Sequence, residues 1–174
     1  RVTGAREMKE SAFVVPPKNA IQKELVLFIS SNKGLCGSFL TSLNRYAFKK
    51  IDYNKTDFIS VGKKGAMFLG MTKGKIVADF STPHPVMEVS AMFKILKDAF
   101  LAGTYSNVHI LYNSFINTLR FETIFEVLLP VQLSEIASEE TPVEKKSSVN
   151  DIYTIEPLSR EVVDSLLESY VEEK

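Results

Sequence analysis

The sequence predicts an α/β fold of the Rossmann-like kind, a three-layer domain built on a largely parallel sheet. Three stretches pair a short apolar run with a following segment of helical period. Strands that alternate with helices favour parallel pairing through right-handed crossovers. We therefore expect a core at residues 24–133, with a lead-in at 1–23, a polar loop at 134–150, and a short strand and helix at 151–174.

The chain reaches its first predicted strand through a polar lead-in. Residues 1–10 are rich in charged side chains, and Pro16 and Pro17 interrupt the segment between them and the strand. Because proline lacks a backbone N–H and breaks a helix, we expect a helix end and then an extended segment. Residues 25–29 form a continuous apolar run, which is typical of a strand buried on both faces of a sheet.

A turn with the sequence SNKGLCGS separates this strand from the first predicted helix. After the apolar run the spacing of apolar residues changes to four, as in a helix with one buried face. The positions concerned are Leu35, Phe39, Leu43 and Ala47. The sequence therefore predicts a strand, a tight turn and a helix between residues 24 and 50.

The same turn carries groups that two kinds of enzyme use. A phosphate cradle needs GxGxxG, or GxxxxGK followed by Ser or Thr, but only Gly34 and Gly37 are present and Lys33 precedes both. A nucleophilic Cys36 would need a general base, and no spacing brings either histidine of the chain to the thiol. We therefore expect Cys36 to be a small packing residue, and we assign no catalytic, cofactor-binding or metal-ligating residue.

Composition excludes several classes of function. The 21 basic and 21 acidic side chains cancel, so the chain lacks the positive field with which nucleic-acid-binding proteins collect phosphates. A single cysteine allows no intrachain disulfide and no multi-cysteine metal site. The apolar runs are shorter than the roughly 20 residues that cross a bilayer, so we expect membrane association only through partner proteins.

Two short strands and a brief helix are predicted next. The strands cover residues 57–61 and 75–80, and Gly65 and Gly70 bracket the helix between them. Lys63 and Lys64 at the start of this helix could hold an anion. A solvated turn explains two lysines beside a glycine better, because lysine keeps its charged end in water.

A packed crossover helix and a buried strand come after these elements. An apolar stripe at helical spacing extends from Val89 to Phe100, and Gly103 ends it. Residues 107–113 are typical of a strand buried in the sheet. His109 lies inside this strand, where we expect a core histidine with satisfied hydrogen bonds and not a metal ligand.

The last strand of the core is predicted to be unusually long. Odd positions between residues 119 and 131 are apolar apart from Thr123, which gives a strand of about 40 Å at the usual rise per residue. Such a strand either projects past the sheet as an edge for a partner or bends at a bulge. Beyond it, residues 134–150 predict a polar loop, IYTIEP at 152–157 a short strand, and 159–172 an amphipathic helix.

Several of these segments resemble the gamma subunit of F-type ATP synthases. SSNKGLCGSF is similar to the SDRGLCGGFN-type signature of that family, and the matching residues are Lys33, Gly34, Leu35, Cys36 and Gly37. ISVGKKGAMFL, the strand that ends in FEVLLPV, the IYTIEP segment and the final helix have counterparts in the same order. The family's long terminal coiled-coil helices are missing, so the chain resembles its globular part flanked by truncated helix ends. The missing second cysteine favours a bacterial form over the chloroplast-type subunit.

This resemblance implies a rotor shaft that has no catalytic role and no cofactor. Such a shaft couples the ion-driven rotation of a membrane ring to ATP synthesis or hydrolysis in the catalytic subunits. The implied partners are the epsilon subunit and the c-ring, with the alpha/beta hexamer reached through the coiled coil, at the cytoplasmic face of a bacterial inner membrane or its organellar equivalent. The resemblance places the epsilon contact near Ile152, Tyr153, Ile155 and Glu156.

Two other functions stay open at the level of sequence. A nucleotide-binding or redox module would hold a phosphate at the SNKGLCG turn with help from Lys33. A cysteine hydrolase would use Cys36 together with His84 or His109. Its thiol would have to titrate well below the usual pKa of about 8.5.

Overall fold

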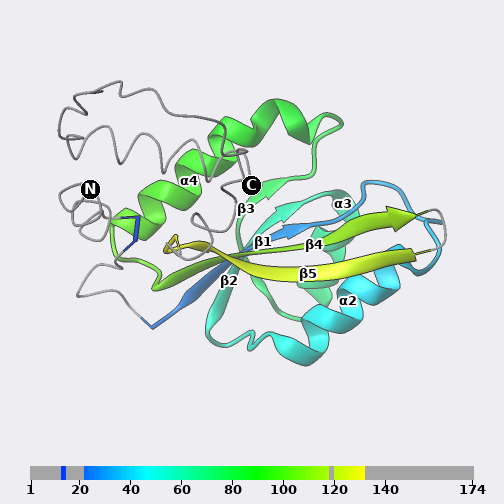
Figure 1. Cartoon of the computed structure of the whole chain (residues 1–174), viewed down its shortest axis with the longest axis horizontal. Coiled ribbons are helices and arrows are strands. Elements are labelled where there is room, and N and C mark those ends of the chain that lie inside the picture. Colours follow the sequence, from blue (N-terminus) through cyan, green and yellow to red (C-terminus); the bar gives the residue numbers. More distant parts are fainter. Residues whose placement is uncertain (1–12, 15–21, 118–119, 132–174) are drawn as a thin grey trace, which may run out of the picture.

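The chain forms one five-stranded sheet in the order β3-β2-β1-β4-β5 (Figure 1). This arrangement comes from a computed structural model, which describes residues 13–14, 22–117 and 120–131. The strands are β1 (Glu24–Ile29), β2 (Thr56–Val61), β3 (Lys75–Phe80), β4 (Asn107–Asn117) and β5 (Arg120–Leu129). The first four run parallel, and β5 returns antiparallel to β4. The largely parallel sheet confirms the predicted fold class.

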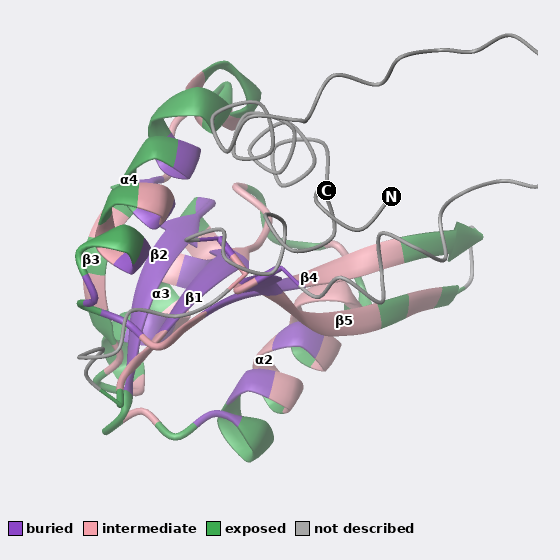
Figure 2. Ribbon diagram, turned by 60° about the vertical axis from the view of Figure 1, so that its left-hand side comes forward, coloured by how far each residue is buried: buried purple, intermediate pink, exposed green. Residues whose placement is uncertain are grey.

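Helices cover both faces of this sheet. The helices are α2 (Ser38–Lys50), α3 (Lys63–Met71) and α4 (Val89–Leu101), the last preceded by a 3-10 turn at Pro85–Glu88. Figure 2 shows α4 on one side of the sheet and α2 on the other. A separate apolar cluster fills each interface. Leu43 of α2 and Leu69 of α3 belong to one cluster, and Leu96 and Phe100 of α4 belong to the other. The molecule therefore has the three layers that the sequence predicts.

Strand β1 lies in the middle of the sheet and contributes to both clusters. Leu25 and Leu27 point toward α4, whereas Val26 and Phe28 point toward α2 and α3. All four are buried. Alternate side chains of a strand point to opposite faces, so a central strand needs apolar residues at every position. The apolar run at 25–29 is continuous because both faces of β1 are buried.

The first helix begins later than its apolar spacing suggests. Helix α2 starts at Ser38, and Leu43 and Ala47 are its buried residues. Leu35 is fully exposed with φ +61°, so the prediction that it belongs to the buried stripe is wrong. The chain has not yet entered the helix at Leu35, and the turn carries this side chain outward.

The predicted boundaries of the second helix are also wrong. Gly65 and Gly70 lie inside α3 and do not bracket it. Gly65 is buried against β1, and Gly70 is exposed on the outer face. Glycine is a common helix terminator, but at Gly65 the close approach of the helix to the strand is what requires it.

Strands β4 and β5 form a ribbon that extends past the other strands (Figures 1 and 2). β4 continues to Asn117, beyond the predicted end at Asn113, and pairs with β5 along its length. The expectation that the last strand alone outgrows its neighbours is therefore wrong. The two alternatives for this strand were a projecting edge and a bend at a bulge. β5 is an edge strand, and the β4–β5 register shifts at two places, so features of both are present.

Several predictions fall on residues outside the described ranges. They are most of the lead-in at 1–23, the polar loop at 134–150, the strand at 152–157 and the helix at 159–172. The strands predicted at 57–61 and 75–80 and the crossover helix ending before Gly103 are present. The described core thus matches the predicted order of elements from residue 24 to residue 131.

Candidate functional site

The SNKGLCGS turn leaves the sheet where the strand order changes direction. The chain passes from β1 to β2 through α2 on one face, and from β3 to β4 through α4 on the other. β1 and β4 are neighbours, so the switch in direction lies between them. In doubly wound sheets this is the place where ligands bind, at the carboxyl ends of the strands. The contacts of the turn therefore decide whether it is free to hold one.

Polar groups at the end of β1 are bound to the start of α3. Three bonds join Ser30 Oγ to the Gly65 N–H at 2.7 Å, the Ser31 carbonyl to the Lys64 N–H at 3.1 Å, and Asn32 Oδ1 to the Lys63 N–H at 3.1 Å. The first turn of a helix leaves its N–H groups without partners inside the helix, and these bonds satisfy three of them. We call residues 30–32, bound in this way, the signature brace.

The signature brace extends to two further strands. Asn32 donates its side-chain amide to the Thr82 carbonyl at 2.8 Å, which links the turn to the chain after β3. The Ser30 hydroxyl lies 3.0 Å from the Val61 carbonyl and 3.1 Å from that of Gly62, at the end of β2. Gly62 has φ +94°, and a Cβ there would lie 2.4 Å from the Ser30 carbonyl oxygen. The brace therefore depends on a glycine at the end of β2.

These contacts test two possible anion sites, the SNKGLCG turn with Lys33 and the pair Lys63 and Lys64 at the start of α3. The N–H groups of Lys63 and Lys64 already donate to Asn32 and Ser31 in the turn after β1, so they are not available to a phosphate. The Lys33 side chain is exposed at the surface of the turn. The arrangement favours the solvated turn over a phosphate cradle, because the donors that such a cradle would use are engaged in holding the fold.

Cys36 lies half-buried in the turn. Its sulfur is 3.6 Å from Ser31 Oγ and 3.7 Å from the Lys33 carbonyl oxygen. Within the described ranges no hydrogen bond joins it to His84 or His109. These contacts are local to the turn, as expected for a small packing residue, and they offer no general base for a nucleophilic thiol.

The signature residues divide into an inner and an outer part. Cys36 faces the brace, whereas Lys33, Gly34, Leu35 and Gly37 are exposed. An exposed leucine with a left-handed backbone is uncommon, because β-carbon atoms disfavour positive φ. The turn therefore exposes the apolar side chain of Leu35, while the hydrogen bonds of the signature brace hold the adjoining residues in place.

A buried charged cluster at the opposite, amino edge of the sheet was not predicted. Asp57 at the start of β2 is buried, and Lys23 Nζ lies 2.7 Å from its Oδ1. The Tyr105 hydroxyl donates to Asp57 Oδ2 at 2.9 Å, and Lys75 Nζ lies 3.5 Å from the same oxygen. The cluster joins the starts of β1, β2 and β3 to the segment before β4. An aspartate within the apolar run TDFISV is the signal that sequence reasoning missed.

The cluster shifts the titration of its members in opposite directions. Burial on its own would raise the pKa of Asp57, but the hydrogen bonds from Lys23 and Tyr105 and the charges of Lys23 and Lys75 lower it on balance. Burial, together with the hydrogen bond to Asp57 and its charge, raises the pKa of Tyr105 to about 12. Asp57 is therefore held ionised and Tyr105 protonated, which suits a structural contact and not proton transfer near neutral pH.

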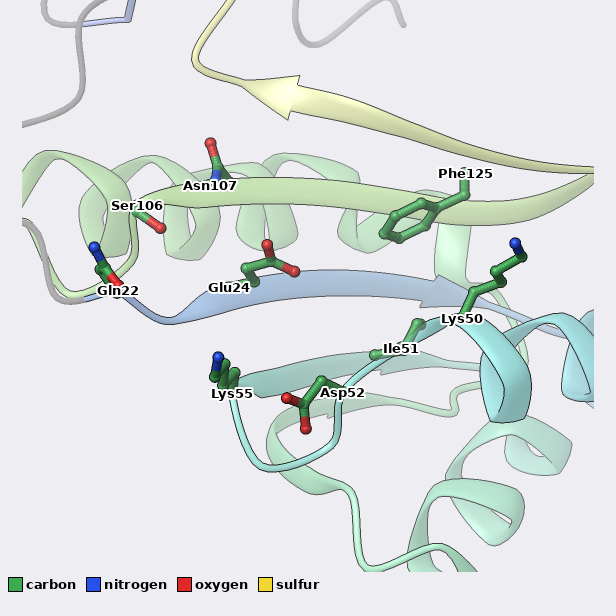
Figure 3. A pocket seen from close by; sticks show the side chains of 9 residues that line it. All are labelled: Gln22, Glu24, Lys50, Ile51, Asp52, Lys55, Ser106, Asn107 and Phe125. Carbon is green, nitrogen blue, oxygen red and sulfur yellow. The ribbon is translucent and has the colours of Figure 1, made fainter.

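A hollow of about 580 Å³ opens at this amino edge (Figure 3). It lies among the starts of β1 and β4, the end of α2 and the loop that leads to β2. Its lining consists of Gln22, Glu24, Lys50, Ile51, Asp52, Lys55, Ser106, Asn107 and Phe125. Two acidic and two basic side chains balance, and the remaining polar groups are neutral. The hollow is thus polar without a net charge.

His109 lies beneath two of these lining residues. Its ring stacks on Phe125 with 4.7 Å between the ring centroids, and its Nε2 is 3.7 Å from Glu24 Oε2. His109 is 8% exposed, and neither ring nitrogen has a hydrogen-bond partner among the described residues. The burial agrees with the core position that the sequence predicts. Glu24 is the charged neighbour of His109, and whether both ring nitrogens are hydrogen-bonded stays a prediction.

Three further points concern only the residues that the structure describes. No group of three or more His, Cys, Asp or Glu side chains converges there to hold a metal. No helix among them is long and apolar enough to cross a membrane. The predicted partner contact at Ile152, Tyr153, Ile155 and Glu156 lies outside the described ranges.

Comparison with known proteins gives one consistent result. The family described as ATP synthase matches residues 2–174. The ATP synthase gamma chain of Ralstonia nicotianae is 34% identical over 164 residues, which are 89% of this chain and 55% of that protein. The ATP synthase gamma chain of Delftia acidovorans is 33% identical over 156 residues, 84% of this chain and 52% of that protein. The chain thus spans about half the length of these curated relatives.

Solved structures show the same fold. The rotor of the Euglena gracilis mitochondrial ATP synthase, in rotational state 1, superimposes with a TM-score of 0.60 at 14% identity, over 95% of this chain and 66% of that chain. The central stalk and c-ring structure of the Tetrahymena thermophila mitochondrial ATP synthase gives a TM-score of 0.53 at 21% identity, over 97% and 74%.

Proposed function

Because the chain belongs to the ATP synthase gamma family, we propose that it is the globular part of a central rotor shaft. In this role it couples the rotation of an ion-driven ring to ATP synthesis or hydrolysis in the catalytic subunits. The observation that carries the proposal is the family match, which extends over residues 2–174 and not over the signature turn alone.

The proposed role is mechanical, and the chain itself performs no catalysis. A shaft domain must transmit force without yielding, which favours a core packed on both faces of the sheet. The two apolar clusters and the cross-strand bonds of the signature brace have this character. The same bonds occupy the groups that a nucleotide site at the turn would need, which disfavours the nucleotide-binding or redox module.

The proposed partners are the epsilon subunit and the c-ring, with the alpha/beta hexamer reached through coiled-coil helices. We assign the epsilon contact to Ile152, Tyr153, Ile155 and Glu156. The division into a core at 24–133 with flanking segments belongs to the same proposal. So does the location, which is peripheral at the cytoplasmic face of a bacterial inner membrane or its organellar equivalent.

Isothermal titration of the full 174-residue chain with the epsilon subunit of the same organism tests the proposal. ATP and NADH are titrated separately. We expect saturable epsilon binding and no heat from either nucleotide. Nucleotide binding without epsilon binding would refute the proposal and support the nucleotide-binding module.

Charge substitution tests the assigned contact. Tyr153→Asp or Ile155→Asp should weaken epsilon binding at least about tenfold, because buried aromatic and aliphatic anchors dominate interfaces. Lys73→Glu, on an exposed turn between α3 and β3, is the control and should leave the affinity unchanged. Equal affinity in all three variants would contradict the assignment while leaving the rotor role itself intact.

A further inference from the structure

A groove of about 260 Å³ lies between α2 and β5, which run side by side in Figures 1 and 2. We call it the α2–β5 groove, and it is lined by Ser42, Arg45, Tyr46, Lys49, Lys50 and Thr123. Two aromatic contacts hold the helix against the strand. The ring centroids of Phe39 and Phe121 are 5.4 Å apart, and those of Tyr46 and Phe125 are 5.9 Å apart. Thr123 lies between these contacts, so the groove follows the line along which the helix meets the strand.

The α2–β5 groove is positively charged, although the chain as a whole is neutral. Its lining includes Arg45, Lys49 and Lys50, and the sequence of α2 contains no acidic residue. All three cations are exposed, and within the described ranges none of them forms an ion pair with a carboxylate. The dipole of α2 favours basic residues in its last turn, but Arg45 lies before that turn. A groove with charge of one sign fits a partner of the opposite sign.

The acidic side chains of β5 do not neutralise this groove, because they point to the other face of the sheet. Phe121 and Phe125 contact α2, and Thr123 lines the groove. The odd positions of the strand therefore face the helix. Side chains alternate along a strand, which places Glu122 and Glu126 on the opposite face.

The backbone of β5 is the second feature of the groove. β5 is the outermost strand in the order of the described sheet, and it pairs with β4 on its inner side. An edge strand presents a row of N–H and C=O groups on its outer side, and an extended chain can pair with them. A lipid headgroup or a free anion would use the cations alone, whereas an extended peptide would use the cations and the strand together.

The spacing of the cations fits the side chains of an added strand. The two aromatic contacts between α2 and β5 advance in the same direction along both elements, so the helix and the strand run alongside each other. Arg45 and Lys49 are four residues apart, which displaces them by about 6 Å along the helix axis. Alternate side chains of a strand are about 6.7 Å apart. Two acidic residues at alternate positions of the strand would therefore each meet one cation.

We propose that the α2–β5 groove binds an extended acidic segment of a partner protein, which adds to β5 as a further strand and sets alternate carboxylates against Arg45 and Lys49. A second copy of this chain does not fit. Pairing β5 with β5 about a twofold axis would bring the equally basic α2 of the second copy to the same place. The residues concerned differ from those assigned to the epsilon contact, and the proposal does not rest on the rotor function.

The test uses the full chain and a short synthetic peptide that alternates glutamate with valine and carries a fluorescent label. Fluorescence anisotropy at low salt should show one saturable site. Arg45→Glu and Lys49→Glu should each weaken binding at least about tenfold, because an attractive contact becomes a repulsive one. Lys94→Glu makes the same change of charge at an exposed position of α4, across the sheet from the groove, and should bind as the wild type does.

Two further measurements separate strand addition from charge attraction alone. Methylation of the backbone nitrogens of the peptide removes its N–H donors but no carboxylate, and it should abolish binding. Bound peptide should slow hydrogen exchange at the amides of β5 and not at those of β3, the opposite edge of the described sheet.

The outcomes are distinguishable. Circular dichroism establishes that each variant is folded, and Arg45→Gln replaces the charge reversal if that variant does not fold. Absence of saturable peptide binding overturns the proposal, as does equal binding of the methylated peptide or unchanged affinity in both α2 variants. Binding to phosphatidylglycerol vesicles in place of the peptide would assign the groove to a lipid headgroup and equally overturn it.

Discussion

The two glycines inside α3 should respond to the same substitution with opposite signs. Gly65 faces β1, where an added Cβ would lie 2.6 Å from Ser30 Oγ and 2.8 Å from Phe28 Cδ1. Gly70 faces solvent, and a Cβ there meets no heavy atom within 4 Å. Gly65→Ala and Gly70→Ala are thus a matched pair in one helix that differ only in what surrounds the new methyl group.

The expected magnitudes come from these contacts. Overpacking a close-packed interface costs about 2 kcal/mol, and loosening the Ser30–Gly65 hydrogen bond costs about 1 kcal/mol. Replacing glycine by alanine in a helix returns about 1 kcal/mol. Gly65→Ala should therefore destabilise the chain by about 2 kcal/mol, because Phe28 is fully buried, stacks on Phe68 and has no room to withdraw. Gly70→Ala should stabilise it by about 0.5–1 kcal/mol.

Urea unfolding followed by circular dichroism measures the difference. With a slope near 2 kcal/mol per molar urea, the midpoints of the two variants should lie about 1–2 M apart, on either side of the wild type. Slopes that agree among the three proteins would establish that folded-state stability has changed and not the unfolded ensemble. If Gly65→Ala unfolds at or above the wild-type midpoint, the close packing of α3 on β1 is refuted.

Four other predictions concern the brace, the charged cluster and the thiol. Ser30→Ala should destabilise the chain by about 1–2 kcal/mol in urea unfolding, since it removes a cap from α3; an unchanged midpoint would contradict the brace. Asp57→Asn should cost about 1.5–3 kcal/mol at pH 7. The lowered pKa of Asp57 means that its contribution is present above about pH 4 and is lost as the pH falls, so wild type and variant should converge in acid, and a constant gap would argue against the cluster. The pKa of Tyr105, raised to about 12, means that the stability it contributes is complete below about pH 10 and is lost as the pH rises toward 12, a dependence that Tyr105→Phe should abolish. Cys36→Ser should change stability by no more than about 0.5 kcal/mol and leave epsilon binding intact, because the thiol makes only local contacts.

Sequence patterns predicted those strands and helices in which the spacing of apolar residues directly reflects which faces are buried. The continuous apolar run at 25–29 marked a central strand, and the stripe from Val89 to Phe100 marked a helix with one buried face. The extension of β4 to Asn117 was missed because residues 114–117 are partly or fully exposed, so their pairing with β5 leaves no apolar alternation to recognise.

The contacts of the site arise from residues far apart in the chain. The signature brace joins residues 30–32 to residues 63–65, and the charged cluster joins Lys23 to Asp57 and Tyr105. Neither periodicity nor composition reports such pairs. The signature turn was located by its letters, but only the structure assigns its inner face to capping α3.

The hollow at the amino edge was beyond sequence reasoning for the same reason. Four separate segments contribute its lining, and the stacking of His109 on Phe125 joins residues that no sequence pattern pairs. From sequence, a histidine in an apolar strand is an ordinary core residue.

The rotor role is tested most directly by isolating the complex that contains this chain. An affinity tag on the chain, expressed in its native organism, is used to purify it from detergent-solubilised membranes, and the subunits recovered are quantified by mass spectrometry. The rotor role predicts one copy of the chain per alpha/beta hexamer, together with epsilon and c subunits. Recovery of the chain in quantity without catalytic or ring subunits would contradict it.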